Sequence, residues 1–316
     1  MTLTELKYIV AVARERHFGR AAEACFVSQP TLSVGIKKLE DELNIKIFER
    51  SANEISLTDV GQEVVRQAQM VLEHAAHIKE IAKLGKDPLS GPLRLGVIYT
   101  VAPYLLPKLV QQVIDRTPQM PLILQENFTA KLLEQLRLGE LDCAILAEPF
   151  NTANLQTMAL YDEPFMAAVP AAHRLAKQNS VSVDDIRNEH VLLLGSGHCF
   201  RDHVLGVCPE FARSTADIDG IHRAFEGSSL ETIKHMVAAG MGMTLVPRLG
   251  VPESALQSPR NTQERIVYLP IDGDAPSRRI VLAWRSSFTR DVAIDALVQA
   301  VQACDLQGVS VVEGVA

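Results

Sequence analysis

The 316-residue sequence has no apolar run that approaches the roughly 18 residues of a membrane-spanning helix. Its first residues, Met1 to Lys7, lack the apolar stretch of a secretory signal peptide. We therefore expect a soluble, cytoplasmic protein with no membrane partner. The five cysteines form no disulfide framework, and in a reducing compartment a disulfide is expected to be transient and sensing rather than structural.

Positively charged residues are also fewer than negatively charged ones, with 31 Lys and Arg against 38 Asp and Glu. The formal net charge is -7 at pH 7, so bulk charge does not attract nucleic acid, and any DNA binding has to come from a local patch. Hydrophobic residues make up 47% of the chain, which is enough to form well-packed hydrophobic cores. The length exceeds that of one ordinary domain, so we expect two or three domains.

Three short helices and a hairpin are predicted over residues 1–58. Apolar residues recur at helical spacing from Leu3 to Ala13, and a second helix covers Gly19–Cys25. Ser28 is a good N-cap for a third helix. The predicted buried face of this helix comprises Leu32, Ile36, Leu39 and Leu43. The strands of the hairpin are expected within residues 45–57.

Two short helices joined by a tight turn, the second polar on its outer face, are typical of a helix-turn-helix. The start of the second helix enters the DNA major groove in such units. The residues placed to meet base edges or phosphates are Gln29, Thr31, Ser33, Val34 and Lys37. We expect the basic residues to gather on one side while Glu40 to Glu42 face away. A generic three-helix module for protein contacts is the alternative.

One long helix is predicted from Thr58 to about Leu84. Its apolar residues recur at three- and four-residue spacing over the whole length. A stripe this long needs a partner, and an identical helix is the simplest one, so we expect a homodimer through residues 59–85. Packing on its own domain is the alternative. Glycines and prolines then predict a hinge at 86–92.

Strand and helix alternate from Leu93 onward. The predicted order is strand 93–98, helix 102–116, strand 121–126, helix 130–138 and strand 141–147. This βαβαβ pattern predicts a parallel sheet with helices on both faces. A segment at 162–169 crosses into a second lobe, and the chain returns to the first lobe from Ile266 through a last helix at 290–304.

Two threonines are candidates for the cleft between the lobes. Thr100 and Thr129 each follow a predicted strand and precede a helix. Ligands of open α/β sheets bind outside the carboxyl ends of strands, so both hydroxyls are expected to point into the cleft. Helix N-capping is the alternative for each threonine, and the two roles are compatible.

Cys199 and Cys208 lie among cations. A buried strand at 191–194 and a Gly-Ser-Gly turn precede them, and a helix is predicted from His198. The helix N-terminus, His198 and Arg201 favour the reactive thiolate at Cys199. On one helix the two thiols would lie roughly 13 Å apart, whereas a disulfide needs Cα atoms about 4.4 to 6.8 Å apart. Oxidation would therefore be a conformational switch.

Two other interpretations of these thiols stay open. Free cysteines are among the most buried residue types, so each one alone fits a core position. His198, Cys199, His203 and Cys208 also form a set that zinc accepts. Adjacent ligands and the lack of a Cys-x-x-Cys or His-x3-His element argue against zinc, and we expect neither a metal nor a cofactor.

The N-terminal unit resembles the winged helix-turn-helix of the LysR-type transcriptional regulators. The resemblance rests on Ala21–Ala24, Ser28–Ser33, Ile36–Glu40, Phe48–Arg50 and Leu57–Gly61. It implies an all-α domain with a β wing, a recognition helix within 28–38 and binding to double-stranded promoter DNA. It adds Ser28, Pro30, Lys38 and the wing residue Arg50 to the DNA contacts above. Gly35 costs this helix about 1 kcal/mol relative to alanine, without a reason visible in the sequence.

The same resemblance implies an α/β regulatory domain of two lobes, similar to periplasmic binding proteins. The expected division is a DNA-binding domain at 1–58, a dimerisation helix at 59–85, a hinge at 86–92, lobe I at 93–162 and 266–304, lobe II at 163–265 and a C-terminal tail at 305–316. The family further implies that dimers pair into a homotetramer and that RNA polymerase is a partner.

Around the thiols the sequence resembles the hydrogen-peroxide-sensing members of the family. The resemblance rests on 197–199, 201–202, Cys208, 229–232 and 236–240. It implies that Cys199 is the peroxidatic thiol and Cys208 the resolving thiol. It assigns the peroxide pocket to Thr100, Thr129, His198, Arg201 and Arg279. The role of His222 is left unassigned.

These expectations combine into a transcription regulator that activates oxidative-stress genes. Hydrogen peroxide oxidises Cys199, a disulfide to Cys208 forms, and a cellular thiol reductant restores the thiols. One alternative is a LysR-type regulator that responds to a small-molecule effector in the cleft. A thiol peroxidase is the other, and the DNA-binding unit argues against an enzyme.

Overall fold

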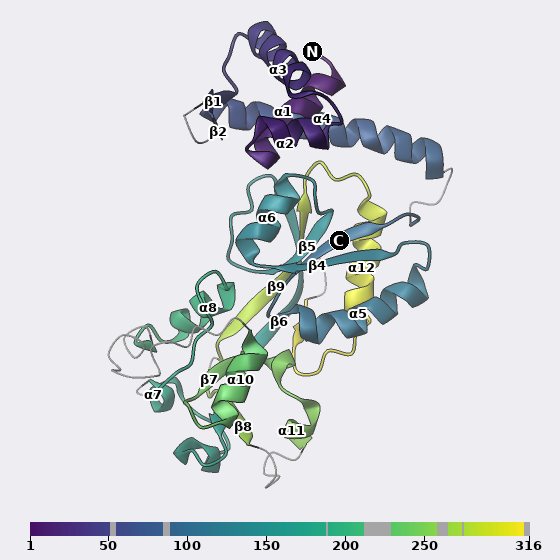
Figure 1. The fold of residues 1–316 in the computed structure, drawn as a ribbon. Helices are drawn as coiled ribbons and strands as arrows, with labels where there is room; N and C mark the ends of the chain where they lie inside the picture. The colour runs from purple at the N-terminus through teal and green to yellow at the C-terminus, as the bar shows by residue number, and fades with distance from the viewer. Residues whose placement is uncertain are drawn as a thin grey trace.

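The computed structural model describes residues 1–50, 55–84, 89–187, 189–211, 229–257, 265–273 and 275–312. Three parts follow one another along the molecule (Figure 1). The N-terminal helices lie at one end, a first α/β lobe lies in the middle, and a second lobe lies at the other end. The predicted helix-turn-helix and two-lobed α/β architecture are both present.

The DNA-binding unit consists of three helices and a wing. The helices are α1 (Leu3–Glu15), α2 (Phe18–Ala24) and α3 (Gln29–Leu43), and the wing pairs β1 (Phe48–Arg50) with β2 (Ile55–Leu57) in antiparallel register. Ser28 caps α3 as expected, since its side chain accepts a hydrogen bond from the Thr31 N–H. The imidazole of His17 caps α2 in the same way.

Two residues of the predicted apolar helix faces in this unit are exposed. Leu3 and Leu43 are 47% and 38% exposed, because α1 begins at the first and α3 ends at the second. Asn44 follows Leu43 in a left-handed conformation and turns the chain away from the core. The prediction was right for Leu32, Ile36 and Leu39, which are fully buried.

Glu40 does not face away from the unit as we expected. It is buried, accepts hydrogen bonds from the backbone N–H groups of Ile47 and Phe48, and pairs with Lys46 at 3.1 Å. Burial acts to raise the pKa of Glu40, but these hydrogen bonds outweigh it and hold the pKa below its ordinary value. Glu40 therefore fastens the start of the wing to α3.

The structure explains Gly35. A Cβ atom at this position would lie 2.8 Å from Cδ2 and 3.0 Å from Cε2 of Tyr8, closer than carbon atoms pack. The ring of Tyr8 on α1 therefore lies directly against the α3 backbone. The lost helix propensity of Gly35 is offset by burial of Tyr8 in the core of the unit.

Helix α4 (Asp59–Leu84) has a packed face and an exposed apolar face. Val65 and Ala68 lie in the core beneath α1, so packing on its own domain, the alternative interpretation, holds for this face. Val60, Val71 and Ile78 are 55%, 44% and 68% exposed. An apolar stripe thus remains open to a partner. No described helix is long and apolar enough to cross a membrane.

Lobe I is built on a mixed sheet. Strands β3 (Leu93–Ile98), β4 (Leu122–Asn127) and β5 (Cys143–Ala147) are parallel, and β9 (Ser277–Arg285) runs antiparallel between β5 and β6 (Leu155–Pro170). The covering helices are α5 (Ala102–Arg116), α6 (Thr129–Arg137) and α12 (Asp291–Gln302). The carboxyl ends of β3 and β4 carry Thr100 and Thr129, as predicted.

The sixteen-residue strand β6 crosses between the lobes. Its first part pairs with β9, and its last part pairs with β7 (Thr244–Pro247) and β8 (Ile266–Pro270) of lobe II. The described helices of lobe II include α7 (Val183–Ile186), α8 (Cys199–Val207), α10 (Leu230–Ala238) and α11 (Glu253–Gln257).

The predicted return to lobe I at Ile266 is wrong. Strand β8 pairs with β6 in lobe II, and Leu269 lies in the lobe II core, so the chain returns with β9 instead. The expected tail at 305–316 is also incorporated in the fold up to residue 312. Leu306 is buried in lobe I, and β10 (Ser310–Val311) pairs with β6. A short apolar strand fits either sheet, and only tertiary pairing decides between them.

Candidate functional site

Helix α8 separates the two thiols. His198 is its N-cap, Cys199 its first residue and Cys208 its C-cap, and the predicted start of a helix at His198 is confirmed to within one residue. All five cysteines are free thiols. Cys199 is half-buried and packs against the lobe I core, whereas Cys208 is 1% exposed within the lobe II core. The helical rise keeps the thiols roughly 13 Å apart, so they meet only if α8 refolds.

Three aromatic rings gather at the start of α8. His198 is 6% exposed, and its ring lies 4.7 Å from Phe128 and 5.8 Å from Tyr99, measured between centroids. Gly197 has φ +98°, and a Cβ there would come within 3.4 Å of Phe128. Tyr99 and Phe128 were missed from sequence, although each directly precedes one of the two predicted cleft threonines.

Thr100 is held by an arginine that the sequence analysis did not choose. Arg278 donates from Nη1 to Thr100 Oγ1 at 2.7 Å and from Nη2 to the Thr100 carbonyl at 2.9 Å. Its Nε donates to Glu163 at 2.9 Å, and both side chains of this ion pair are buried. The Arg278 guanidinium also lies 5.2 Å from the ring centroid of Phe200, the neighbour of Cys199.

Arg279, which the sequence analysis assigned to the peroxide pocket, does not contribute to this cluster. Its side chain is 49% exposed and pairs with Asp162 on the surface. That carboxylate raises the pKa of Arg279, chiefly through the hydrogen bond. The reason is the pleat of β9, which points adjacent side chains to opposite faces of the sheet.

Thr129 carries a buried hydroxyl that lacks a hydrogen-bond partner in the described part of the chain. It is the first residue of α6 and does not cap the helix, because the N-cap is Phe128. Thr100 likewise does not cap α5, whose N-cap is Val101. The capping alternative is therefore wrong for both threonines. Burying a hydroxyl without a hydrogen-bond partner costs free energy of folding, unless a ligand or a water molecule supplies the missing hydrogen bond.

The other cations near the thiols have contacts of their own. Arg201 donates to the Leu194 carbonyl at 2.9 Å and so ties α8 to the segment that precedes it. The buried strand predicted at 191–194 is not formed, because Val191 makes only an isolated bridge to Met243. The Nε2 of His203 lies 2.7 Å from the Glu148 carbonyl, and burial lowers the pKa of this imidazole. The described residues contain no group of three or more His, Cys, Asp or Glu that could hold a metal.

Cys208 has a carboxylate neighbour. Its Sγ donates to Glu210 Oε2 at 3.1 Å. Burial, followed by this hydrogen bond, raises the pKa of the Cys208 thiol. Cys208 is thus kept protonated in the reduced fold.

The outer face of α3 presents the predicted DNA contacts to solvent. The exposed residues are Ser28, Gln29, Pro30, Thr31, Val34, Lys37 and Lys38, and Ser33 is half-buried. Two of the basic residues expected on this side are paired with carboxylates, since Lys38 pairs with Glu5 at 3.0 Å and Lys46 with Glu40. The side chain of Arg50 and the whole of His222 lie outside the described residues.

Family comparisons match both parts of the chain. The family described as "Bacterial regulatory helix-turn-helix protein, lysR family" matches residues 3–62, and "LysR substrate binding domain" matches residues 86–304. The chain belongs to the LysR family. As a LysR protein it is a DNA-binding transcription regulator and not an enzyme.

Individual relatives of this LysR chain share nearly its full length. The "Hydrogen peroxide-inducible genes activator" of Dickeya chrysanthemi is 41% identical over 90% of both chains. Full-length OxyR from Pseudomonas aeruginosa has a TM-score of 0.76 and 47% identity, covering 97% of this chain and 96% of that one. A cysteine variant of Corynebacterium glutamicum OxyR with hydrogen peroxide bound has a TM-score of 0.60 and 31% identity, covering 96% and 92%.

Proposed function

We propose that this LysR regulator senses hydrogen peroxide by oxidation of Cys199 and formation of a Cys199–Cys208 disulfide, and that the switch activates transcription. One observation carries the proposal: the two thiols occupy opposite ends of α8 and pack against different lobes. The disulfide therefore requires α8 to refold. The similarity to OxyR proteins and to a peroxide-inducible activator supports the same chemistry.

The chemistry has two balanced steps. The Cys199 thiolate attacks one oxygen of hydrogen peroxide, the O–O bond breaks, and the other oxygen leaves as hydroxide and takes a proton to become water. Sulfur loses two electrons and becomes a sulfenic acid. The Cys208 sulfur then attacks the Cys199 sulfur, its thiol proton and the sulfenic hydroxyl leave as water, and the disulfide forms. A cellular dithiol reductant reverses the change.

The proposed peroxide pocket consists of Thr100, Thr129, His198 and Arg278. The unpartnered Thr129 hydroxyl is a hydrogen-bond group for peroxide. Arg278 fixes the orientation of Thr100, and His198 is positioned by the surrounding rings. Such groups orient peroxide and supply a proton to the leaving oxygen. Arg201 instead holds the start of α8, and Arg279 is not part of the proposed pocket.

The proposed assembly is a homodimer through residues 59–85 that pairs into a homotetramer. The exposed apolar residues of α4, Val60, Val71 and Ile78, support the dimer interface. The outer face of α3 binds double-stranded operator DNA, with Lys37 and the N-terminal residues of the helix at the groove. RNA polymerase is the proposed protein partner, and the cytoplasm is the proposed location.

Peptide mass mapping tests the sensor directly. Fully reduced full-length protein is treated with equimolar hydrogen peroxide, quenched by alkylation and digested. We expect a rapid, dominant disulfide between Cys199 and Cys208, with Cys25, Cys143 and Cys304 still alkylated as thiols. Unreacted Cys199 and Cys208 would refute peroxide sensing and leave a LysR regulator that responds to a small-molecule effector.

A further inference from the structure

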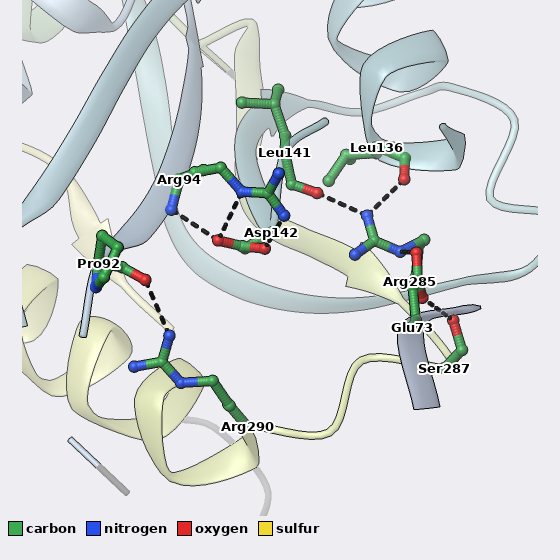
Figure 2. A network of polar contacts seen from close by, with 9 residues as sticks. All are labelled: Glu73, Pro92, Arg94, Leu136, Leu141, Asp142, Arg285, Ser287 and Arg290. Atoms are coloured by element: carbon green, nitrogen blue, oxygen red, sulfur yellow. Dashed lines mark hydrogen bonds and ion pairs between the residues drawn. The ribbon is translucent and has the colours of Figure 1, made fainter. Parts of the chain in front are cut away.

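Arg285, the last residue of β9, joins lobe I to helix α4 (Figure 2). Its side chain is 9% exposed, and Nη1 donates to the carbonyls of Leu136 and Leu141 at 2.5 Å each. Its Nε lies 2.7 Å from Glu73 Oε1 as an ion pair, without the alignment of a hydrogen bond. The guanidinium therefore bridges the connection between α6 and β5 on one side and α4 on the other.

The side chain of Glu73 on α4 contacts lobe I closely on several sides. Ser287 donates its hydroxyl to Glu73 Oε2 at 2.8 Å. Gly139, in the turn after α6, has φ +67°, and a Cβ there would come within 2.8 Å of Glu73 Oε1. The Glu73 side chain is only 21% exposed. Charge, hydrogen bonding and close backbone approach thus converge on one residue of α4.

Other contacts between the N-terminal helices and lobe I are weaker. Arg66 reaches Asn154 at 3.4 Å, and Arg14 lies 3.9 Å from Glu140. Exposed pairs of this length contribute little free energy. Among the described contacts, Glu73 is therefore the strongest attachment of α4 to the regulatory domain.

Strand β9 connects this attachment to the sensor site. Arg278, near its start, holds Thr100 and lies beside Phe200 on α8, and Arg285 ends the strand. The intervening residues 280–284 are buried and paired with β5 on one side and β6 on the other. The seven residue-to-residue steps from Arg278 to Arg285 span roughly 23 Å. A strand hydrogen-bonded on both edges moves as a rigid element, and rigid elements are one of the carriers of coupling between distant sites.

Resting on the proposed peroxide switch, we propose that the contact of Glu73 with Arg285 and Ser287 transmits the oxidation state of Cys199 to the DNA-binding unit. Refolding of α8 moves Phe200 away from Arg278, and the start of β9 shifts. Arg285, at the end of the same strand, then changes its contact with Glu73. Because α4 also packs beneath α1, the shift reorients the DNA-binding unit. Glu73, Arg285 and Ser287 are positioning residues that do not touch peroxide or DNA.

Glu73→Gln tests this coupling in the full-length protein. The substitution keeps an acceptor for Ser287 and removes the charge that faces Arg285. Two quantities are measured: the rate of Cys199–Cys208 disulfide formation, and the affinity of reduced and oxidised protein for a duplex selected from a random library by the reduced wild type. We expect the disulfide rate to change by less than about twofold. Allosteric coupling is typically about 5- to 150-fold, and we expect the ratio of the two affinities to fall close to one.

Glu63→Gln is the matched control, because Glu63 pairs with Arg66 on α4 and contacts no lobe I residue within the described contacts. It should leave both quantities as in the wild type. A Glu73→Gln protein with normal disulfide formation and a wild-type affinity ratio would overturn the proposal. If that variant fails to fold, Ser287→Ala decides: a reduced ratio supports coupling, and an unchanged ratio rejects it. Wild-type protein that forms no disulfide would instead reject the sensor function.

Discussion

The two ends of α8 carry the same functional group in contrasting surroundings. At the N-terminal end Cys199 is half-buried, faces the lobe I core, and lies at the backbone N–H groups that begin the helix. At the other end Cys208 is enclosed in lobe II and hydrogen-bonded to Glu210. The comparison teaches that position on a helix, rather than residue type, separates the two thiols, and in the proposed switch it makes Cys199 the peroxidatic thiol and Cys208 the resolving thiol.

Replacing each cysteine with serine should have the largest effect and tests whether the two thiols have different roles. Cys199→Ser should abolish the peroxide response while DNA binding is retained, because no sulfenic acid forms. Cys208→Ser should let the sulfenic acid accumulate on Cys199 without the intramolecular disulfide. Dimedone labelling followed by mass spectrometry distinguishes the two products. A peroxide response retained by Cys199→Ser would refute the assignment of roles.

Adjacent arginines on β9 provide the next test, on the Cys199 side of the comparison. Arg278→Gln should destabilise the protein by about 3–5 kcal/mol, because it leaves the buried carboxylate of Glu163 without its charge partner. It should also slow Cys199 oxidation by freeing Thr100. Arg279→Gln removes only an exposed pair with Asp162, which solvent screens, and should change the stability much less. Urea unfolding measures both, and equal losses would contradict the burial difference.

A smaller effect is expected on the Cys208 side. Burial and the Glu210 hydrogen bond raise the pKa of Cys208, so its thiolate forms only at higher pH than that of an ordinary cysteine. Glu210→Gln removes the negative charge and should lower this pKa. The pH profile of Cys208 alkylation by iodoacetamide in the reduced protein should then shift to lower pH, with faster alkylation at a fixed pH. An unshifted profile would show that burial alone sets the pKa.

Much of this arrangement was predictable because local signals coincide with it. Strand β3 and helix α5 have the predicted bounds, since an apolar run and a helical stripe are separated by a turn. The N-cap role of Ser28 and the start of α8 after a glycine turn were predicted for the same reason. Such features depend on residues close together in the chain.

The misses depend on contacts between distant residues. Arg278 and Arg279 are equally cationic, and only the register of β9 against β6 decides which one is buried. The burial of Glu40 requires the returning wing, and the assignment of β8 requires knowledge of its pairing partner. The pairing of Lys38 with Glu5 joins residues 33 positions apart. Sequence periodicity holds no information on any of these.

The continuity of β6 has a consequence for folding cooperativity. One continuous strand contributes hydrogen bonds to the sheets of both lobes, and it lies between β10 and β9 in lobe I and between β7 and β8 in lobe II. Neither sheet can therefore lose β6 without exposing backbone groups of the strands paired with it. The regulatory domain should therefore melt in a single transition despite its two hydrophobic cores. The slowest amide hydrogen exchange is expected along β6, on both sides of the lobe boundary.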